Sequence, residues 1–95
     1  MKDQEKLKRI SWIIEYITKN NNLDVDILNQ YFSDKYINNF NPKYKPEKYG
    51  AFKCRELGQI LSYGYHMGKL IRVPVGISFH ETGFPNWVYC YNIIP

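Results

Sequence analysis

The spacing of the apolar residues changes once along this chain of 95 residues, at Gly68. Before Gly68 they recur every three or four residues, the period of a helix that buries one face. After Gly68 they alternate with other residues over 69–75 and 87–93, which is typical of β-strands. The sequence therefore predicts an α+β fold in which three helices are followed by a two-stranded β-hairpin.

The first helix is predicted over residues 4–19. Its inward stripe is expected to hold Leu7, Ile10, Ile13, Ile14 and Ile17. Three consecutive asparagines, Asn20 to Asn22, follow this stripe. Asparagine tolerates left-handed backbone geometry and competes for local hydrogen bonds, so the helix is expected to end there.

The second helix is predicted to begin at Asp24, a good N-cap residue, and to run to about Asn39. Leu23, just before this cap, indicates either a hydrophobic staple or a short extra strand. The apolar stripe is expected to hold Ile27, Leu28, Tyr31, Phe32 and Tyr36.

The third helix is predicted from about Phe52 to Met67, with Gly68 as the residue that terminates it. Its inward residues are expected to be Leu57, Ile60, Leu61 and Met67. Gly58 and Gly64 lie inside this helix, where they either weaken it or permit a close approach of another backbone. A loop over 41–50, with two prolines and alternating tyrosines and lysines, separates it from the second helix.

The two predicted strands, 69–75 and 87–93, are joined by a long turn-rich tip. Pro74 lies near the end of the first strand, a position typical of edge strands. The tip contains Phe79, His80, Glu81 and Phe84, and Trp87 follows it. This composition suits an apolar contact better than a phosphate contact.

The length and the 44% share of hydrophobic residues predict one domain over 1–95 with a modest core. The sequence has no run of about 18 apolar residues, so we expect a cytoplasmic protein without a membrane partner. Two cysteines, Cys54 and Cys90, favour buried thiols, although a disulfide between them stays open. Richness in Asn, Ile, Lys and Tyr is typical of AT-rich genomes and suggests a microbial or viral source.

The net charge of +4 is unevenly distributed. Residues 1–40 carry six basic and six acidic side chains, whereas residues 41–72 carry seven basic against two acidic ones. A local basic surplus favours binding of phosphates, because their neutralisation releases counterions. A solvated lysine loop is the alternative interpretation of this surplus.

The end of the third helix resembles the corresponding part of winged helix-turn-helix domains. In that family a glycine ends the third helix and an aliphatic pair and a basic residue follow. Gly68, the pair Leu70 and Ile71, and Arg72 match this pattern. The resemblance implies a double-stranded DNA-binding protein, a small transcriptional regulator whose third helix enters the major groove while the wing contacts the backbone.

The resemblance also implies a set of contact residues. A polar face of the third helix would read bases, with Lys53 and Glu56 at its edge, and the basic loop and the wing base would contact phosphates. The residues expected in these roles are Lys43, Lys45, Lys48, Lys53, Arg55, Gln59, Ser62, Tyr63, His66, Lys69 and Arg72.

Winged helices also serve as protein-interaction modules, so an adaptor or inhibitor acting through the aromatic wing and the Tyr/Lys loop is the alternative function. Binding of single-stranded nucleic acid by that loop is a third interpretation. A homodimer would use the first helix or the wing.

No metal site and no cofactor are expected, since Cys54, His66, His80 and Cys90 lack the paired spacing of zinc ligands. A cysteine nucleophile with a histidine base has no activating feature in the sequence. We therefore expect that this protein is not an enzyme.

Overall fold

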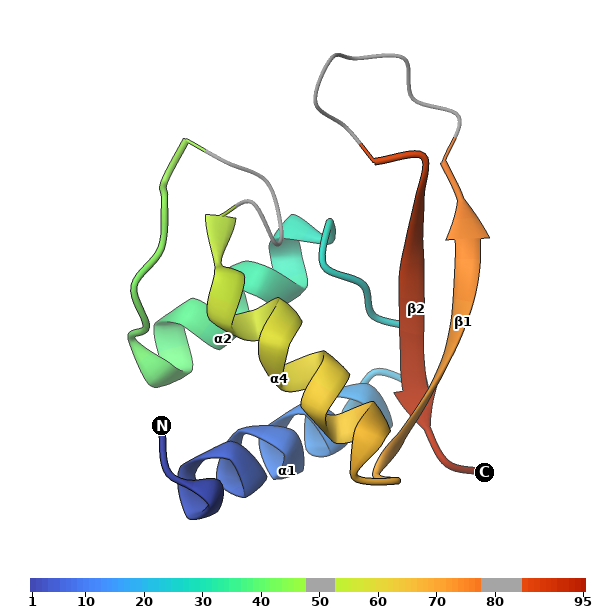
Figure 1. Ribbon diagram of the computed structural model, residues 1–95, viewed down its shortest axis with the longest axis horizontal. Helices are drawn as coiled ribbons and strands as arrows, with labels where there is room; N and C mark the ends of the chain where they lie inside the picture. The colour runs from blue at the N-terminus through green and yellow to red at the C-terminus, as the bar shows by residue number, and fades with distance from the viewer. Residues whose placement is uncertain (48–52, 78–84) are drawn as a thin grey trace.

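The computed structural model describes residues 1–47, 53–77 and 85–95. In these ranges three helices precede an antiparallel pair of strands, and the pair stands beside the helices (Figure 1). The elements are α1 (Asp3–Lys19), α2 (Gln30–Phe40), α4 (Arg55–His66), β1 (Leu70–Gly76) and β2 (Trp87–Ile93). The predicted α+β class and the order of its elements are confirmed.

Helix α1 supplies one wall of the core. Ile10, Ile13 and Ile17 are buried and Ile14 is half-buried, as the 3.6-residue period predicted. Leu7 lies at the flank of this stripe and is exposed, so the prediction that it points inward is wrong. The helix ends at the asparagines as expected.

The asparagines turn the chain toward the hairpin. Asn21 and Asn22 have positive φ angles of 59° and 57°, in the left-handed region that asparagine tolerates. The chain then forms an isolated bridge in which Val25 exchanges two backbone hydrogen bonds, of 2.9 and 2.7 Å, with Tyr91 of β2. The extra strand expected near Leu23 is thus a single bridge two residues later, and Leu23 itself is 50% exposed.

Helix α2 begins six residues later than the cap predicted at Asp24. Asn29 is the N-cap, and its Oδ1 accepts a hydrogen bond of 3.1 Å from the backbone N–H of Phe32. Asp24 instead accepts a hydrogen bond from the Asn92 side chain. The bridge at Val25 keeps this segment extended, so the helix starts only after it.

The buried face of α2 contains Phe32 and Tyr36, as predicted. Tyr31 is 63% exposed, which contradicts its predicted place in the stripe. Because the helix starts late, Ile27 and Leu28 lie before it, and both are half-buried there.

A close contact joins the end of α4 to β1. Gly68 adopts φ +71°, and the amide of Lys69 donates a hydrogen bond of 2.9 Å to the carbonyl of Gly64, so Gly68 terminates the helix as predicted. Leu70 packs so tightly on Gly64 that an added Cβ would lie 2.8 Å from its Cδ1. Gly64 therefore permits a close approach, here by the Leu70 side chain and not by another backbone. Met67 at the C-cap is 49% exposed, so the prediction that it points inward is wrong.

The hairpin register explains why Pro74 is tolerated. The polar backbone groups of Tyr91 point to Val25, away from β1, so Arg72 and Tyr91 form a non-hydrogen-bonded pair. Two residues along, Pro74 and Tyr89 form another such pair. The missing N–H of Pro74 therefore costs no bond to β2 and blunts the outer edge of β1.

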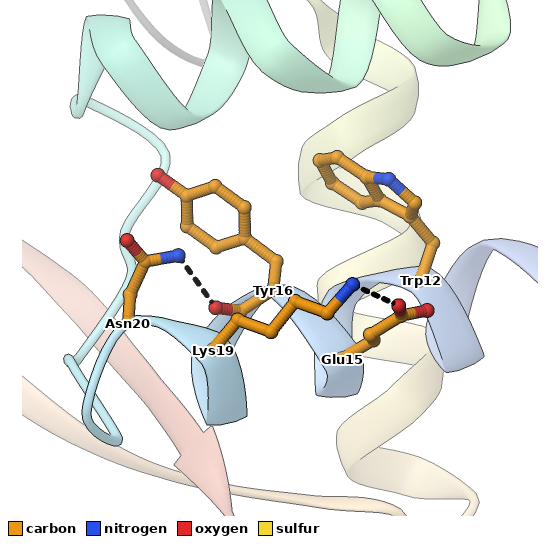
Figure 2. Close-up of a pocket in the computed structure, with 5 residues that line it drawn as sticks. All are labelled: Trp12, Glu15, Tyr16, Lys19 and Asn20. Carbon is orange, nitrogen blue, oxygen red and sulfur yellow. Dashed lines mark hydrogen bonds and ion pairs between the residues drawn. The ribbon is translucent and has the colours of Figure 1, made fainter.

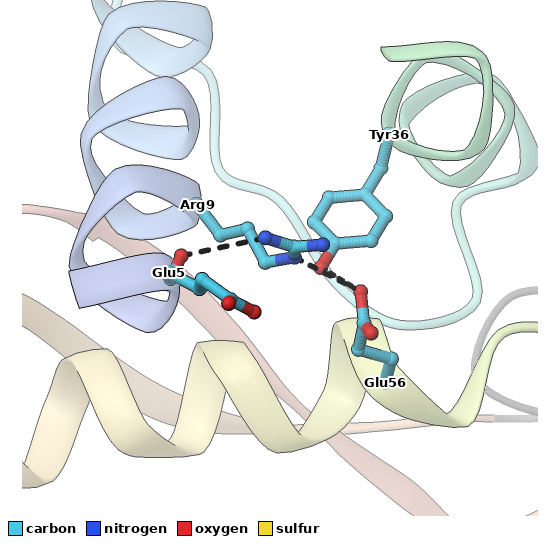
Figure 3. A network of polar contacts seen from close by, with 4 residues as sticks. All are labelled: Glu5, Arg9, Tyr36 and Glu56. Carbon is cyan, nitrogen blue, oxygen red and sulfur yellow. Dashed lines mark hydrogen bonds and ion pairs between the residues drawn. The ribbon is translucent and has the colours of Figure 1, made fainter. Parts of the chain in front are cut away.

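One carboxylate connects the three described helices (Figure 3). Glu56 of α4 accepts a hydrogen bond of 3.2 Å from Arg9 Nε of α1 and one of 2.5 Å from the Tyr36 hydroxyl of α2. Burial and the bond to Glu56 raise the pKa of Tyr36 above its ordinary range. The network fixes α4 against the other two helices on one side.

Replacement of Gly64 by valine is expected to lower the free energy of unfolding by about 2 kcal/mol, because the new side chain overlaps the buried Leu70. Ser11→Val on the exposed face of α1 is the matched control for helix propensity. Denaturant unfolding measures both variants, and equal stabilities of the two would contradict the close packing at Gly64.

The raised pKa of Tyr36 predicts a loss of stability in alkali. The folded state retains the phenol proton, and the unfolded chain releases it above about pH 10. The contribution of the Tyr36 hydroxyl to the free energy of unfolding is therefore complete below that pH and is progressively lost above it. The free energy of unfolding should fall by about 1.4 kcal/mol per pH unit from this group. Urea titrations in alkali should show a shallower decline for Tyr36→Phe, while Tyr31→Phe at an exposed position should decline as the wild type does.

Candidate nucleic-acid interface on helix α4

A row of polar side chains follows the face of α4 that points away from the core. Steps of four, three and four residues place these side chains on one side of a helix. The members of the α4 row are Arg55, Gln59, Ser62 and His66. Ser62 is half-buried and the others are exposed, while Leu57 and Leu61 are buried on the opposite side.

Tyr63, predicted with this face, lies instead toward α1. The ammonium group of Lys6 lies 4.9 Å from the centroid of its ring, and the ring packs against the core. Glu56, predicted at the edge of the face, is engaged by Arg9 and Tyr36. Its negative charge is therefore compensated on the α1 side of the helix.

Lys53 anchors the start of α4 to α2. Its Nζ lies 2.5 Å from Asp34 Oδ1 and 5.9 Å from the centroid of the Tyr44 ring. The Lys53 side chain is largely buried and paired with Asp34, whereas the sequence placed it at the edge of the DNA-contacting face. The partners that hold it come from two segments distant in sequence.

The basic loop after α2 returns to the beginning of α4. The backbone N–H of Lys45 donates a hydrogen bond of 2.7 Å to the carbonyl of Lys53. Lys43 and Lys45 are both exposed, and this bond places the backbone of Lys45 next to the residues that precede α4. Lys48 lies outside the described residues.

At the other end of α4, Lys69 is exposed and Arg72 is stacked. The Arg72 guanidinium carbon lies 3.9 Å from the ring centroid of Tyr65 of α4 and 3.9 Å from that of Tyr89 of β2. Trp87, two residues before Tyr89, lies on the same face of β2 and is 51% exposed. The predicted tip residues Phe79, His80, Glu81 and Phe84 lie outside the described residues.

Four cations of the expected interface form no salt bridge among the described residues. Within residues 1–47, 53–77 and 85–95, no salt bridge engages Lys43, Lys45, Arg55 or Lys69. The two acidic groups nearest α4 in these contacts, Asp34 and Glu56, are each paired with a cation. The described basic side chains that the sequence placed in the interface are thus not neutralised by ion pairs, apart from Lys53.

The cysteines form no bridge. Cys54 is buried and Cys90 is half-buried, and both are free thiols, so the disulfide left open by the sequence is not formed. Burial raises the pKa of both thiols, and Asp26 and Asp24 raise that of Cys90 further. Thiols of this kind are poor nucleophiles at neutral pH.

A small pocket of about 140 Å³ lies on the C-terminal half of α1, where Trp12 and Tyr16 point toward α2 (Figure 2). Trp12 and Tyr16 form its aromatic wall, and Lys19 pairs with Glu15 across it. The Asn20 side chain donates to the carbonyl of Tyr16. The charged groups of this pocket, Lys19 and Glu15, already pair with each other, which leaves the α4 row as the stronger candidate site.

The described residues contain no group of three His, Cys, Asp or Glu side chains arranged to hold a metal ion. In the same part of the chain, each helix is too short or too polar to cross a bilayer. Comparison of the chain with protein-family models, with curated proteins and with solved structures found no match.

The different burial of the two thiols predicts two rates of modification. Cys90 should react first with an aromatic disulfide reagent at mildly alkaline pH, and Cys54 more slowly because its reaction requires opening of the core. Absorbance of the released thiolate measures both phases, and Cys90→Ser should remove the faster one. Equal rates in the folded protein would contradict the burial of Cys54.

Proposed function

We propose that this chain is a winged-helix protein that binds double-stranded DNA and inserts α4 into the major groove. The α4 row is the observation that carries the proposal. The order of helices and hairpin, with the Val25 bridge beside β2, suits a winged-helix arrangement in which the hairpin is the wing.

The chemistry of the α4 row suits base edges. An arginine fork fits the two acceptors of guanine, and a glutamine amide pairs with adenine. Arg55 and Gln59 are one turn apart, so the rise along the helix between them is about 6 Å. Ser62 and His66 extend the row, and either can donate to a base or a phosphate.

The cations at the two ends of α4 suit the phosphates that border a groove. Lys45 is hydrogen-bonded through its backbone to Lys53 just before the N-terminal end, Lys43 is two residues away in the same loop, and Lys69 follows the C-terminal end. Phosphate contacts position a protein on a duplex and carry most of its non-specific affinity. We infer a small transcriptional regulator that acts by occupying a site and not by catalysis.

The test is binding to a random duplex pool across a salt series. Wild-type affinity should fall steeply with salt, and Arg55→Ala should reduce the slope of log affinity against log salt by about one unit or relax the preference at one base pair. Gln59→Ala should leave the slope unchanged and reduce discrimination at one position by about 1–3 kcal/mol.

Lys8→Ala is the matched control, since Lys8 is an exposed cation on α1 beside Phe40 of α2. Its affinity and slope should equal those of the wild type. Absence of duplex binding at low salt would overturn the proposal. Stronger binding of a single strand than of a duplex would favour the Tyr/Lys loop as the interface.

A separate observation favours protein binding as the second candidate function. Ile71, Val73 and Val75 form an exposed apolar row on the outer face of β1, with Val73 54% exposed. If this row binds a protein partner and not DNA, replacement of Val73 by lysine should leave duplex affinity unaffected. If no duplex is bound, this hairpin face becomes the leading interface.

A further inference from the structure

Two contacts of different character fasten the hairpin to the end of α4. Leu70 packs on Gly64, and two pairs further along the ladder Arg72 is held between two rings. Arg72, Tyr65 and Tyr89 are called the clamp below. Its two rings come from different elements, α4 and β2, so it bridges the helix and the hairpin.

The register places the clamp on the face of the hairpin that is turned to the helices. Arg72 opposes Tyr91, and Tyr89 is its diagonal neighbour on the same face. The next residues of β1 on that face, Pro74 and Gly76, are exposed. Arg72 is therefore the last residue of β1 on this face that is not exposed, and it contacts Tyr65 of α4.

Stacking uses the planar faces of the guanidinium group. A lysine ammonium group carries the same charge, but it has no flat face with which to stack on two rings at once. A residue that acts through its charge tolerates lysine, whereas a residue that acts through stacking does not. This difference separates a phosphate contact from a residue that orients the wing.

We propose that Arg72 is a positioning residue whose clamp sets the angle between the wing and α4. This inference rests on the proposed function, because the angle decides whether a duplex held by α4 also meets the wing. Arg72 acts through Tyr65 and Tyr89, and not by binding a phosphate as the sequence suggested. The apolar contact of Leu70 with Gly64 holds the base of the hairpin but not its outer half.

The test compares Arg72→Lys with Arg72→Ala in the intact chain. If Arg72 positions the wing, both variants should lose roughly five- to tenfold in duplex affinity, and Arg72→Lys should keep the wild-type salt slope. Lys69→Ala is the matched cation control, and it should reduce the slope by about one unit as a phosphate contact does. Wild-type affinity of Arg72→Lys would overturn the inference.

Backbone ¹⁵N relaxation in the absence of DNA supplies an independent readout. Arg72→Lys should increase fast motion at Val75 and Trp87 while the amides of Leu70 and Tyr91 stay rigid. Unchanged order at Val75 and Trp87 would overturn the clamp. If the wild type binds no duplex, the proposed function fails, and the relaxation data still decide whether the clamp orders the hairpin.

A second pair of variants tests the clamp from the helix side. Tyr65→Leu removes one ring without changing any charge, and it should reproduce the effects of Arg72→Lys. Tyr65→Phe keeps the ring and should restore both affinity and hairpin order. If Arg72 variants do not fold, this pair alone decides, and equal behaviour of the Leu and Phe variants would overturn the inference.

Discussion

The Glu56 carboxylate is the interaction on which the arrangement of the helices depends. It accepts hydrogen bonds from Arg9 of α1 and Tyr36 of α2, so a single side chain of α4 fixes the helix against both neighbours. Removal of one partner of a partly buried pair leaves a charge without compensation, which costs more than the pair contributes. The network engages the flank of α4 next to the α4 row, and Arg55, Gln59 and His66 of that row remain exposed.

Most of the fold could be predicted from the sequence because its signals are local. The bounds of β2 and the end of α4 at Gly68 follow from alternation and from the conformational freedom of glycine. The start of α2 could not be predicted in this way. Asp24, Asp26 and Asn29 are all good caps, and the choice among them depends on the bridge between Val25 and Tyr91, a contact between distant parts of the sequence.

In the candidate site, too, local signals predict some residues correctly, whereas contacts between distant parts of the sequence decide the others. Helical geometry alone places Arg55, Gln59 and His66 opposite the core, and they are exposed as predicted. Lys53 and Glu56 lie at the flanks of α4, where neighbouring elements decide their partners. Because those partners lie on α1 and α2, periodicity within α4 carried no signal that either charge is engaged.

The two ends of α4 are held by different kinds of force, and this affects how salt acts on the protein. Ion pairs of Lys53 and Glu56 hold its first turn, and they weaken as salt screens them. The packing of Leu70 on Gly64 and the stacking of Arg72 hold its last turn, where apolar contact and a cation–π interaction act in place of an ion pair. The angle between α4 and the hairpin should therefore change little over salt concentrations that weaken phosphate contacts. A steep salt dependence of duplex binding would then report on the interface and not on loosening of the hairpin.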